Sequence, residues 1–221
     1  MNDIIDLRIK EKVYRNKKEV VRVLENFNLR VKKGEMLAVI GKSGAGKTSL
    51  LNILGLLDKD FEGSYRIFDR ETSDMKSKDM ARLRNSKIGF VLQESALINS
   101  ISMEDNIKLP LLYASKDFTF DKKAFDKILE RIGLRPILKK KPLECSGGEK
   151  SRAIFARAII MNPSLILCDE PTASLDPYNS KLIMDLLLKM NKEKNVTVIT
   201  VTHDMDIANN HGRVVEILRR S

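Results

Sequence analysis

A short glycine-rich segment contains the residues of this sequence that most directly suggest chemistry: GKSGAGKT, from Gly41 to Thr48, fits the pattern G-x-x-x-x-G-K-[ST] at every fixed position. Its glycines let the backbone curl so that successive N–H groups point at phosphate, and a helix that begins there adds the positive end of its dipole. Lys47 would bring a positive charge to the β- and γ-phosphates, and the Thr48 hydroxyl can ligate Mg²⁺. The segment predicts a site for a nucleoside triphosphate with Mg²⁺, whether in a kinase, a GTPase or an ATPase. The residues predicted to bind the nucleotide here are Gly41, Ser43, Gly44, Ala45, Gly46, Lys47, Thr48 and Ser49.

Two adjacent acidic residues follow an apolar segment further along the chain. Leu165–Cys168 is typical of a buried strand, and Asp169 and Glu170 come directly after it. Ligands of open α/β sheets lie beyond the carboxyl ends of the strands. We therefore expect Asp169 to hold Mg²⁺, directly or through water. We expect Glu170 to face the γ-phosphate and to polarise the attacking water, a role in which a placed base contributes about 10²–10⁴-fold.

The elements that must position these groups alternate between strands and helices. Met36–Ile40 is a continuous apolar strand directly before the glycine-rich segment, and Ser49–Leu57 after it is compatible with a helix. Apolar residues at helical spacing predict helices at Phe125–Ile132 and Leu182–Met190. Further strands are predicted at Ile5–Ile9, Phe27–Val31, Ser64–Asp69, Ile88–Leu92, Val196–Val201 and Val214–Leu218. The alternation indicates an α/β fold with a mostly parallel sheet and a helical lobe inserted between its strands.

Length and composition limit the classes of protein that this chain can represent. Its 221 residues suit one domain, and 43% hydrophobic with 32% charged residues indicates a folded globular chain. No apolar run approaches the ~18–20 residues of a membrane helix, and the first ten residues lack the pattern of a secretory signal. Two cysteines are too few for a disulfide scaffold. These features predict a cytoplasmic protein.

The chain is strongly basic, with 40 Lys and Arg against 30 Asp and Glu and a net charge of +10. Such an excess favours an anionic neighbour, which could be nucleic acid, nucleotide or lipid headgroups. At an anionic membrane surface each nearby Lys or Arg contributes about 1 kcal/mol. Charge alone leaves these partners open.

A second motif carries a resemblance to a known family. CSGGEKSR, from Cys145 to Arg152, resembles the LSGGQ signature of ATP-binding cassette (ABC) ATPases, and LILCDEPTASLD follows it in the expected place. The resemblance covers the chain from about Ile4 to Leu218. It implies a P-loop NTPase fold with a mostly parallel core sheet, an N-terminal antiparallel β subdomain and an inserted α-helical subdomain. In this interpretation residues 1–94 and 162–221 form the ATP-binding core, and residues 95–161 form the helical subdomain.

The resemblance also implies roles for single residues. Gln93 is similar to the glutamine that contacts Mg²⁺ and water and links the core to the helical subdomain. His203 resembles the switch histidine that contacts the γ-phosphate, and Asp176 lies in the segment that resembles the D-loop. Tyr14 stands where the family places an aromatic ring that stacks on adenine.

The signature segment, Ser146–Glu149, has the features of a second anion site. Ser146 supplies a hydroxyl, Gly148 exposes its backbone N–H, and a helix begins there. The resemblance implies a head-to-tail homodimer with two ATP molecules, each held between the glycine-rich segment of one chain and Ser146, Gly148 and Glu149 of the other. Cys145 replaces the family's usual Leu, and Glu149 replaces its usual Gln, which adds a negative charge near the nucleotide.

The stretch LRNSKIGFVLQ…LINSISMEDNIKLPLLY is similar to the lipoprotein-release and macrolide or peptide export group of bacterial cassettes. The likeness implies a subunit on the cytoplasmic face of the inner membrane that drives a separate transmembrane permease, in export or extraction of a peptide, antibiotic or lipoprotein. A neighbouring open reading frame that encodes a four-span permease with a large extracytoplasmic domain would settle this class. A cell-division cassette and a nucleic-acid-associated cassette remain alternatives, with nucleic acid the less favoured partner. A small-molecule kinase has no use for the signature segment.

Overall fold

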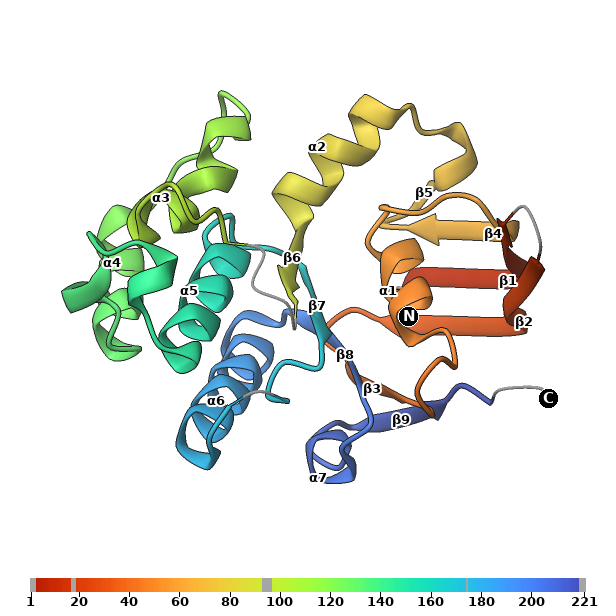
Figure 1. Cartoon of the computed structure of the whole chain (residues 1–221). Coiled ribbons are helices and arrows are strands. Elements are labelled where there is room, and N and C mark those ends of the chain that lie inside the picture. Colours follow the sequence, from red (N-terminus) through yellow and green to blue (C-terminus); the bar gives the residue numbers. More distant parts are fainter. Residues whose placement is uncertain (1–2, 17–18, 93–96, 174, 219–221) are drawn as a thin grey trace.

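The computed structural model describes residues 3–16, 19–92, 97–173 and 175–218 and arranges them as two sheets with helices around them (Figure 1). The antiparallel sheet has the order β2-β1-β4-β5, and the parallel sheet has the order β6-β7-β8-β3-β9. The strands of the first are β1 (Asp3–Asn16), β2 (Glu19–Lys32), β4 (Glu62–Ile67) and β5 (Arg70–Glu71). Those of the second are β3 (Met36–Ile40), β6 (Ile88–Val91), β7 (Leu165–Asp169), β8 (Thr197–Thr202) and β9 (Arg213–Glu216). The predicted α/β fold with a parallel core sheet and an antiparallel β subdomain is confirmed.

Strands β1 and β2 form a hairpin that is longer than the alternation of apolar residues predicted. Ile5, Leu7 and Ile9 point inward as expected and are almost fully buried. The remainder of each strand carries charged side chains, such as Lys10 and Glu25, which hide the strand from a search for apolar alternation. Backbone pairing with the neighbouring strand holds these residues extended all the same.

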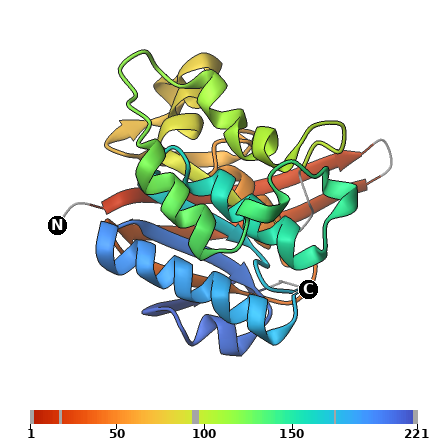
Figure 2. The ribbon, with the colours of Figure 1, turned by 90° about the vertical axis from the view of Figure 1, so that its left-hand side faces the viewer.

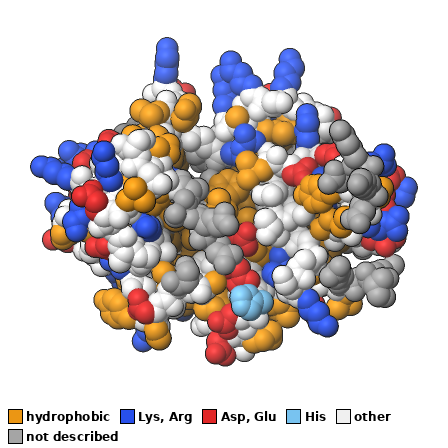
Figure 3. Space-filling view, viewed as in Figure 1, with side chains coloured by type: hydrophobic (Ala, Val, Ile, Leu, Met, Phe, Trp, Pro, Cys, Tyr) orange, Lys and Arg blue, Asp and Glu red, His pale blue; other side chains and the backbone are white. Residues whose placement is uncertain are grey.

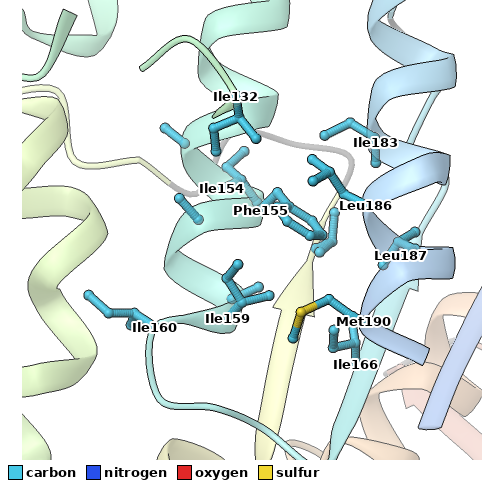
Figure 4. Close-up of a cluster of buried hydrophobic side chains, with 14 of the residues drawn as sticks. Ile132, Ile154, Phe155, Ile159, Ile160, Ile166, Ile183, Leu186, Leu187 and Met190 are labelled. Atoms are coloured by element: carbon cyan, nitrogen blue, oxygen red, sulfur yellow. The ribbon is translucent and has the colours of Figure 1, made fainter. Parts of the chain in front are cut away.

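The parallel sheet separates two hydrophobic clusters, because successive side chains of a strand point to opposite faces. In β7, Leu165 and Leu167 pack on the face that carries α1 (Lys47–Leu54), whereas Ile166 and Cys168 pack on the other face. That other face is covered by α5 (Gly147–Ile159) and α6 (Pro177–Lys194). In Figure 4 the side chains of α5 and α6, Phe155 and Leu186 among them, point toward one another across this cluster.

The segment between β6 and β7 is mostly helical, as predicted, and packs beside the sheet (Figure 2). It contains α3 (Met103–Lys108), α4 (Lys122–Arg131) and α5, with short 3₁₀ turns at η2 (Leu109–Tyr113), η3 (Arg135–Ile137) and η4 (Pro142–Glu144). Phe125 and Leu129 of α4 are buried, in agreement with the helical spacing of the sequence. Toward the carboxyl terminus α7 (Met205–Ala208) follows β8.

Helix α2 (Ser77–Lys87), which follows the 3₁₀ turn η1 (Thr72–Asp74), was not predicted. Met80 is its one buried residue, so no apolar stripe marks the helix in the sequence. Helix α2 leads directly into β6 at the open edge of the parallel sheet. Within the described part of the chain, no helix has both the length and the apolar character needed to cross a membrane.

Candidate functional site

The glycine-rich segment lies between β3 and α1, in the middle of the molecule. Gly44 and Gly46 have φ of 75° and 93°, a region that side chains with a Cβ rarely adopt. A Cβ on Gly46 would also lie 2.7 Å from Cγ1 of Val23, in the hairpin above. Both positions therefore require glycine. The curled loop ends at the first turn of α1, which Gly46 begins without any side-chain cap.

Lys47 is folded over this loop. Its Nζ donates to the backbone carbonyl of Gly41 at 2.7 Å and to that of Lys42 at 3.2 Å. Ala45 is buried beneath the loop, whereas Ser43 is exposed on its outer side. The curled loop therefore presents backbone N–H groups together with the Lys47 ammonium group, as the sequence predicts for a phosphate site.

Thr48 and Asp169 approach each other at the carboxyl ends of the parallel strands, although 121 residues separate them in the chain. Thr48 Oγ1 donates to Asp169 Oδ2 at 3.3 Å. Partial burial raises the pKa of Asp169, the hydrogen bond from Thr48 lowers it, the charge of Glu170 raises it and that of Lys47 lowers it, with a net rise. A hydroxyl and a carboxylate are hard oxygen ligands of the kind that Mg²⁺ prefers, and Mg²⁺ commonly takes its remaining ligands from phosphate and water. The pair fits the predicted magnesium role. Among the described residues no group of three or more His, Cys, Asp and Glu could hold a metal alone.

Glu170 is held in one orientation by groups from β8 and the residue after it. Nδ1 of His203 lies 2.6 Å from Oε1 of Glu170, and Thr202 Oγ1 donates to Oε2 at 2.9 Å. The backbone N–H of His203 donates to Oε1 as well, at 3.0 Å. Glu170 has φ of 45°, a conformation that costs a non-glycine residue about 1–2 kcal/mol. Its carboxylate is 11% exposed, whereas His203 is 69% exposed and faces solvent.

Tyr14, near the end of β1, lies beside the first turn of α1. Its hydroxyl is 3.2 Å from Ser49 Oγ and 3.3 Å from Asp58 Oδ2. The side chain is 44% exposed. The structure thus brings this ring to the glycine-rich segment, where the sequence analysis expected an aromatic residue for the base.

The signature segment forms the start of α5 and satisfies its own polar groups. Ser146 Oγ accepts from the backbone N–H of Glu149 at 3.2 Å, and the Glu149 carboxylate accepts from the backbone N–H of Ser146 at 2.7 Å. This is a capping box. The hydrogen bond from the Ser146 N–H is the main cause that lowers the pKa of Glu149.

Asn179 joins the signature segment to the start of α6. It accepts a hydrogen bond from Arg152 of α5, and its backbone N–H donates to Asp176 Oδ1 at 2.9 Å. A Cβ on Gly148 would lie 2.6 Å from Asn179 Nδ2, so this glycine permits the close packing of the two helix starts. Asp176 acts as the N-cap of α6.

The predicted residues therefore form two separate groups, on the two sides of the parallel sheet. The first group gathers at α1 and the carboxyl ends of β3, β7 and β8, and it consists of Tyr14, Gly41, Ser43, Gly44, Ala45, Gly46, Lys47, Thr48, Ser49, Asp169, Glu170 and His203. The second group, Ser146, Gly148, Glu149 and Asp176, lies at the starts of α5 and α6, on the opposite face of the sheet from α1. Gln93 lies outside the described residues.

Sequence reasoning missed several residues that contact these groups, among them Lys12, Asn179 and Thr202. A hydroxyl residue directly precedes His203 and is visible in the sequence as a polar residue at a strand end. Lys12 carries no such signal, because simple alternation of β1 places position 12 outward. Asn179 carries no comparable signal, because only the packing of α5 on α6 makes it a bridge.

Comparison with known proteins places the chain among relatives of one kind. The family model described as ABC transporter matches residues 24–173. A lipoprotein-releasing system ATP-binding protein LolD from Pseudoalteromonas translucida is 38% identical over 215 residues, which cover 97% of this chain and 93% of that protein. A macrolide export ATP-binding/permease protein MacB from Mannheimia succiniciproducens is 35% identical over 97% of this chain, but this chain spans about a third of the MacB length.

Solved structures agree with this relationship. A dimeric structure of MJ0796, a bacterial ABC transporter cassette, superposes with a TM-score of 0.89 at 36% identity, covering 96% of this chain and 94% of that one. A dimeric post-hydrolysis state of the same cassette, bound to ADP and Pi, gives the same TM-score at 35% identity.

Proposed function

Because the chain belongs to the ABC transporter family, as an ATP-binding cassette of the ATP-hydrolysing type, we propose that two copies close on two ATP molecules and thereby drive a separate membrane permease. The observation that carries this proposal is the division of the predicted site into two separate groups within one chain, one at the start of α1 and one at the starts of α5 and α6. Each group is half of a nucleotide site, and a head-to-tail pair of chains would bring two complementary halves together twice. The dimers reported for the cassette MJ0796 support such a pairing.

In the proposed reaction, Glu170 is the base. It takes a proton from the water that attacks the γ-phosphorus, while the bond from that phosphorus to the β-γ bridging oxygen breaks and ADP leaves. Thr202 and His203 hold the carboxylate in place, so that it meets the water in a fixed orientation. Lys47 would leave its loop carbonyls to contact the phosphates.

The metal would be held by Thr48 and Asp169. Held by these two side chains, Mg²⁺ would supply positive charge to the phosphate oxygens. The closeness of the two side chains, 3.3 Å between Thr48 Oγ1 and Asp169 Oδ2, supports this assignment. Gln93 is proposed to complete the site on the basis of its place in the sequence.

A groove beside α2 is the proposed seat of the permease. It has a volume of about 660 Å³ and lies between α2, β6, η2 and α5. Its floor is apolar, and its basic residues are Lys78, Arg82, Arg84 and Arg157, whereas none of the described residues that line it is acidic. Figure 3 shows hydrophobic side chains in the hollow of this face, with Lys and Arg side chains projecting above it. Tyr113 and the neighbouring Leu112 are 76% and 75% exposed at its edge. These features suit an amphipathic permease helix that carries acidic residues.

The cargo class is proposed from the relatives. Their names describe macrolide export and lipoprotein release. We propose the same broad class for this chain: export or extraction of a peptide, antibiotic or lipoprotein. The organisation would be that of LolD, whose length this chain covers almost completely, with the permease as a separate subunit at the inner membrane. The basic surface is suited to that anionic leaflet.

The concentration dependence of ATP hydrolysis tests the shared site. The purified chain should release phosphate from ATP in the presence of Mg²⁺ but not with EDTA. Turnover per chain should rise with protein concentration, because each complete site needs two chains. Turnover per chain that stays constant over a hundredfold dilution would contradict the shared site, and absence of phosphate release would contradict the ATPase.

Charge reversal at the groove tests the permease seat. Arg82→Glu should abolish co-purification with the proposed permease subunit, co-expressed with this chain, while the ATPase of the isolated chain is kept. The matched control is Arg70→Glu, on the exposed strand β5 away from the groove. Equal loss of the permease in both variants would refute the groove as the docking site.

A further inference from the structure

A buried lysine lies under the aromatic ring at the nucleotide end of the hairpin. The side chain of Lys12 is 1% exposed, although lysine is almost never buried without a partner. Its Nζ lies 4.5 Å from the centre of the Tyr14 ring, within range of a cation–π contact. None of the nucleotide roles considered above uses this residue.

The strand itself is built to turn Lys12 inward. Ile5, Leu7 and Ile9 alternate toward the core, and simple continuation would place position 11 inward and position 12 outward. The pairing of β1 with β4 shifts register between Ile9 and Glu11, and the pairing with β2 shifts between Lys12 and Val13. Such irregularities re-aim side chains and are frequent beside functional sites. As a result Lys12 and Tyr14 share one face of β1.

Asp58, in the loop after α1, fixes the position of the lysine. Its Oδ2 lies 2.8 Å from Lys12 Nζ, which also donates to the backbone carbonyl of Asp60. Burial alone raises the pKa of Asp58, but the hydrogen bond from Lys12, the backbone N–H of Asp60, the charge of Lys12 and the Tyr14 hydroxyl together lower it. Asp58 therefore stays ionised and holds the ammonium group against the ring.

The same carboxylate restrains the other end of Tyr14. The Tyr14 hydroxyl is 3.3 Å from Asp58 Oδ2 and 3.2 Å from Ser49 Oγ, in the first turn of α1. The ring is thus held through its hydroxyl by two groups and through one face by the cation. Tyr14 is 44% exposed, which leaves part of its surface for another flat group.

We infer that Lys12 and Asp58 are positioning residues for the nucleotide base: they hold the Tyr14 ring in the orientation in which adenine stacks on it. The inference rests on the proposed function, in which Tyr14 receives the base. It goes further by making the affinity for the base depend on a buried ion pair that does not touch the nucleotide. The phosphates, bound by the glycine-rich segment, should not depend on this pair.

A comparison of two ligands, one with the base and one without, tests this inference on the full chain. Calorimetry should measure the affinities of a non-hydrolysable ATP analogue and of inorganic triphosphate, both with Mg²⁺. Stacking of a base on an aromatic ring is worth about tenfold or more in affinity. Tyr14→Ala should therefore lower the affinity for the ATP analogue by that amount. Lys12→Met should lower the affinity for the ATP analogue by about three- to tenfold and leave the affinity for triphosphate unchanged. In the Tyr14→Ala background, Lys12→Met should have no further effect.

Two more variants guard against loss of folding. Asp58→Asn keeps the size of the side chain but removes the carboxylate charge that holds Lys12. It should also lower the affinity for the ATP analogue and leave the affinity for triphosphate unchanged. Lys10→Met is the matched control, because Lys10 is 70% exposed on the same strand and pairs only with Glu62 among the described contacts. It should bind both ligands as the parent chain does.

The outcomes separate this inference from the function on which it rests. If the parent chain binds neither ligand, the proposed function fails and the inference with it. If the parent chain binds both, the inference alone is overturned when Lys12→Met and Asp58→Asn keep full affinity for the analogue. It is equally overturned when they weaken analogue and triphosphate to the same extent.

Discussion

Two helix starts in this molecule are rich in glycine and suited to anions. They differ in how many of their backbone N–H groups already have a hydrogen-bond partner before any ligand binds. Helix α1 begins at Gly46 with no side-chain cap, so the N–H groups of its first turn have no side-chain partner. Helix α5 begins with a capping box in which Ser146 and Glu149 bond to each other's backbone N–H. The first start is open to phosphate, whereas the second must give up contacts of its own to accept it.

The difference teaches an order of events. A single chain can bind the triphosphate at α1, because backbone, Lys47 and Thr48 are all at hand. The signature segment gains from a nucleotide only when a second chain presents one, and its capping box keeps it stable until then. The glycines show the same contrast. Gly46 is required by a left-handed backbone at the loop, but Gly148 is required by the close packing of Asn179.

The largest expected effect comes from the open helix start. Lys47→Ala removes the charge that the loop presents to the phosphates, and we expect the affinity for ATP to fall by about a hundredfold or more, equivalent to about 2.7 kcal/mol. Equilibrium binding of a fluorescent ATP analogue measures the loss. Lys33→Ala, at the exposed turn before β3, is the matched control. Tight ATP binding by the Lys47 variant would show that the start of α1 is not the phosphate site.

The second effect separates binding from chemistry. Glu170→Gln keeps the shape of the side chain but cannot take a proton, so turnover should fall by about 10²–10⁴-fold while ATP still binds. The chain should then accumulate as an ATP-bound dimer, visible by light scattering at a Mg²⁺-ATP concentration at which the parent chain is mostly monomeric. Glu71→Gln, on exposed β5, should behave as the parent does. Normal phosphate release by the Glu170 variant would assign the base to another residue.

These two residues also show what a sequence can predict. Lys47 and Glu170 stand in contiguous motifs beside apolar strands, and the strand order of a parallel sheet brings the ends of β3, β7 and β8 to one edge. The parallel core sheet and its helical lobe follow from the same apolar periodicity. Local pattern was therefore sufficient to predict where these two residues lie in the fold.

Features without a local pattern were not predictable. Helix α2 carries a single buried residue and hence no stripe, although its basic side chains line the groove. The inward turn of Lys12 results from register shifts against two other strands, which no single strand encodes. The bridge from Asn179 to Arg152 depends on how two helices pack.

The third prediction disturbs the satisfied helix start. Ser146→Ala removes a helix cap, at a cost of about 1 kcal/mol, and also the hydroxyl proposed to reach the partner's nucleotide. We expect ATP binding by the single chain to be unchanged, but ATP-driven dimerisation to weaken by about tenfold, because a hydrogen bond to a charged group is lost. Ser102→Ala removes an equivalent serine cap from α3 and controls for the cost in stability. Equal dimerisation of the two variants would leave Ser146 with a capping role only.

The smallest effect is expected at the residue that departs from the usual signature. Glu149→Gln preserves the capping box, which accepts either residue, but removes a negative charge from the side that meets a phosphate. Dimerisation should therefore strengthen by a few fold, opposite in sign to Ser146→Ala.

The lowered pKa of Glu149 adds a pH test. The carboxylate's contribution to the stability of the fold is present above the pKa of an unfolded Glu and is lost as the pH falls through the lower folded value. Thermal unfolding measured below pH 5 should lose this acid-sensitive part in the Gln variant. Glu144→Gln, in the 3₁₀ turn η4 before α5, is the control and should not change dimerisation. A Gln variant that dimerises less well than the parent would mean that the carboxylate itself contacts the partner chain, and that the second helix start recognises something other than phosphate.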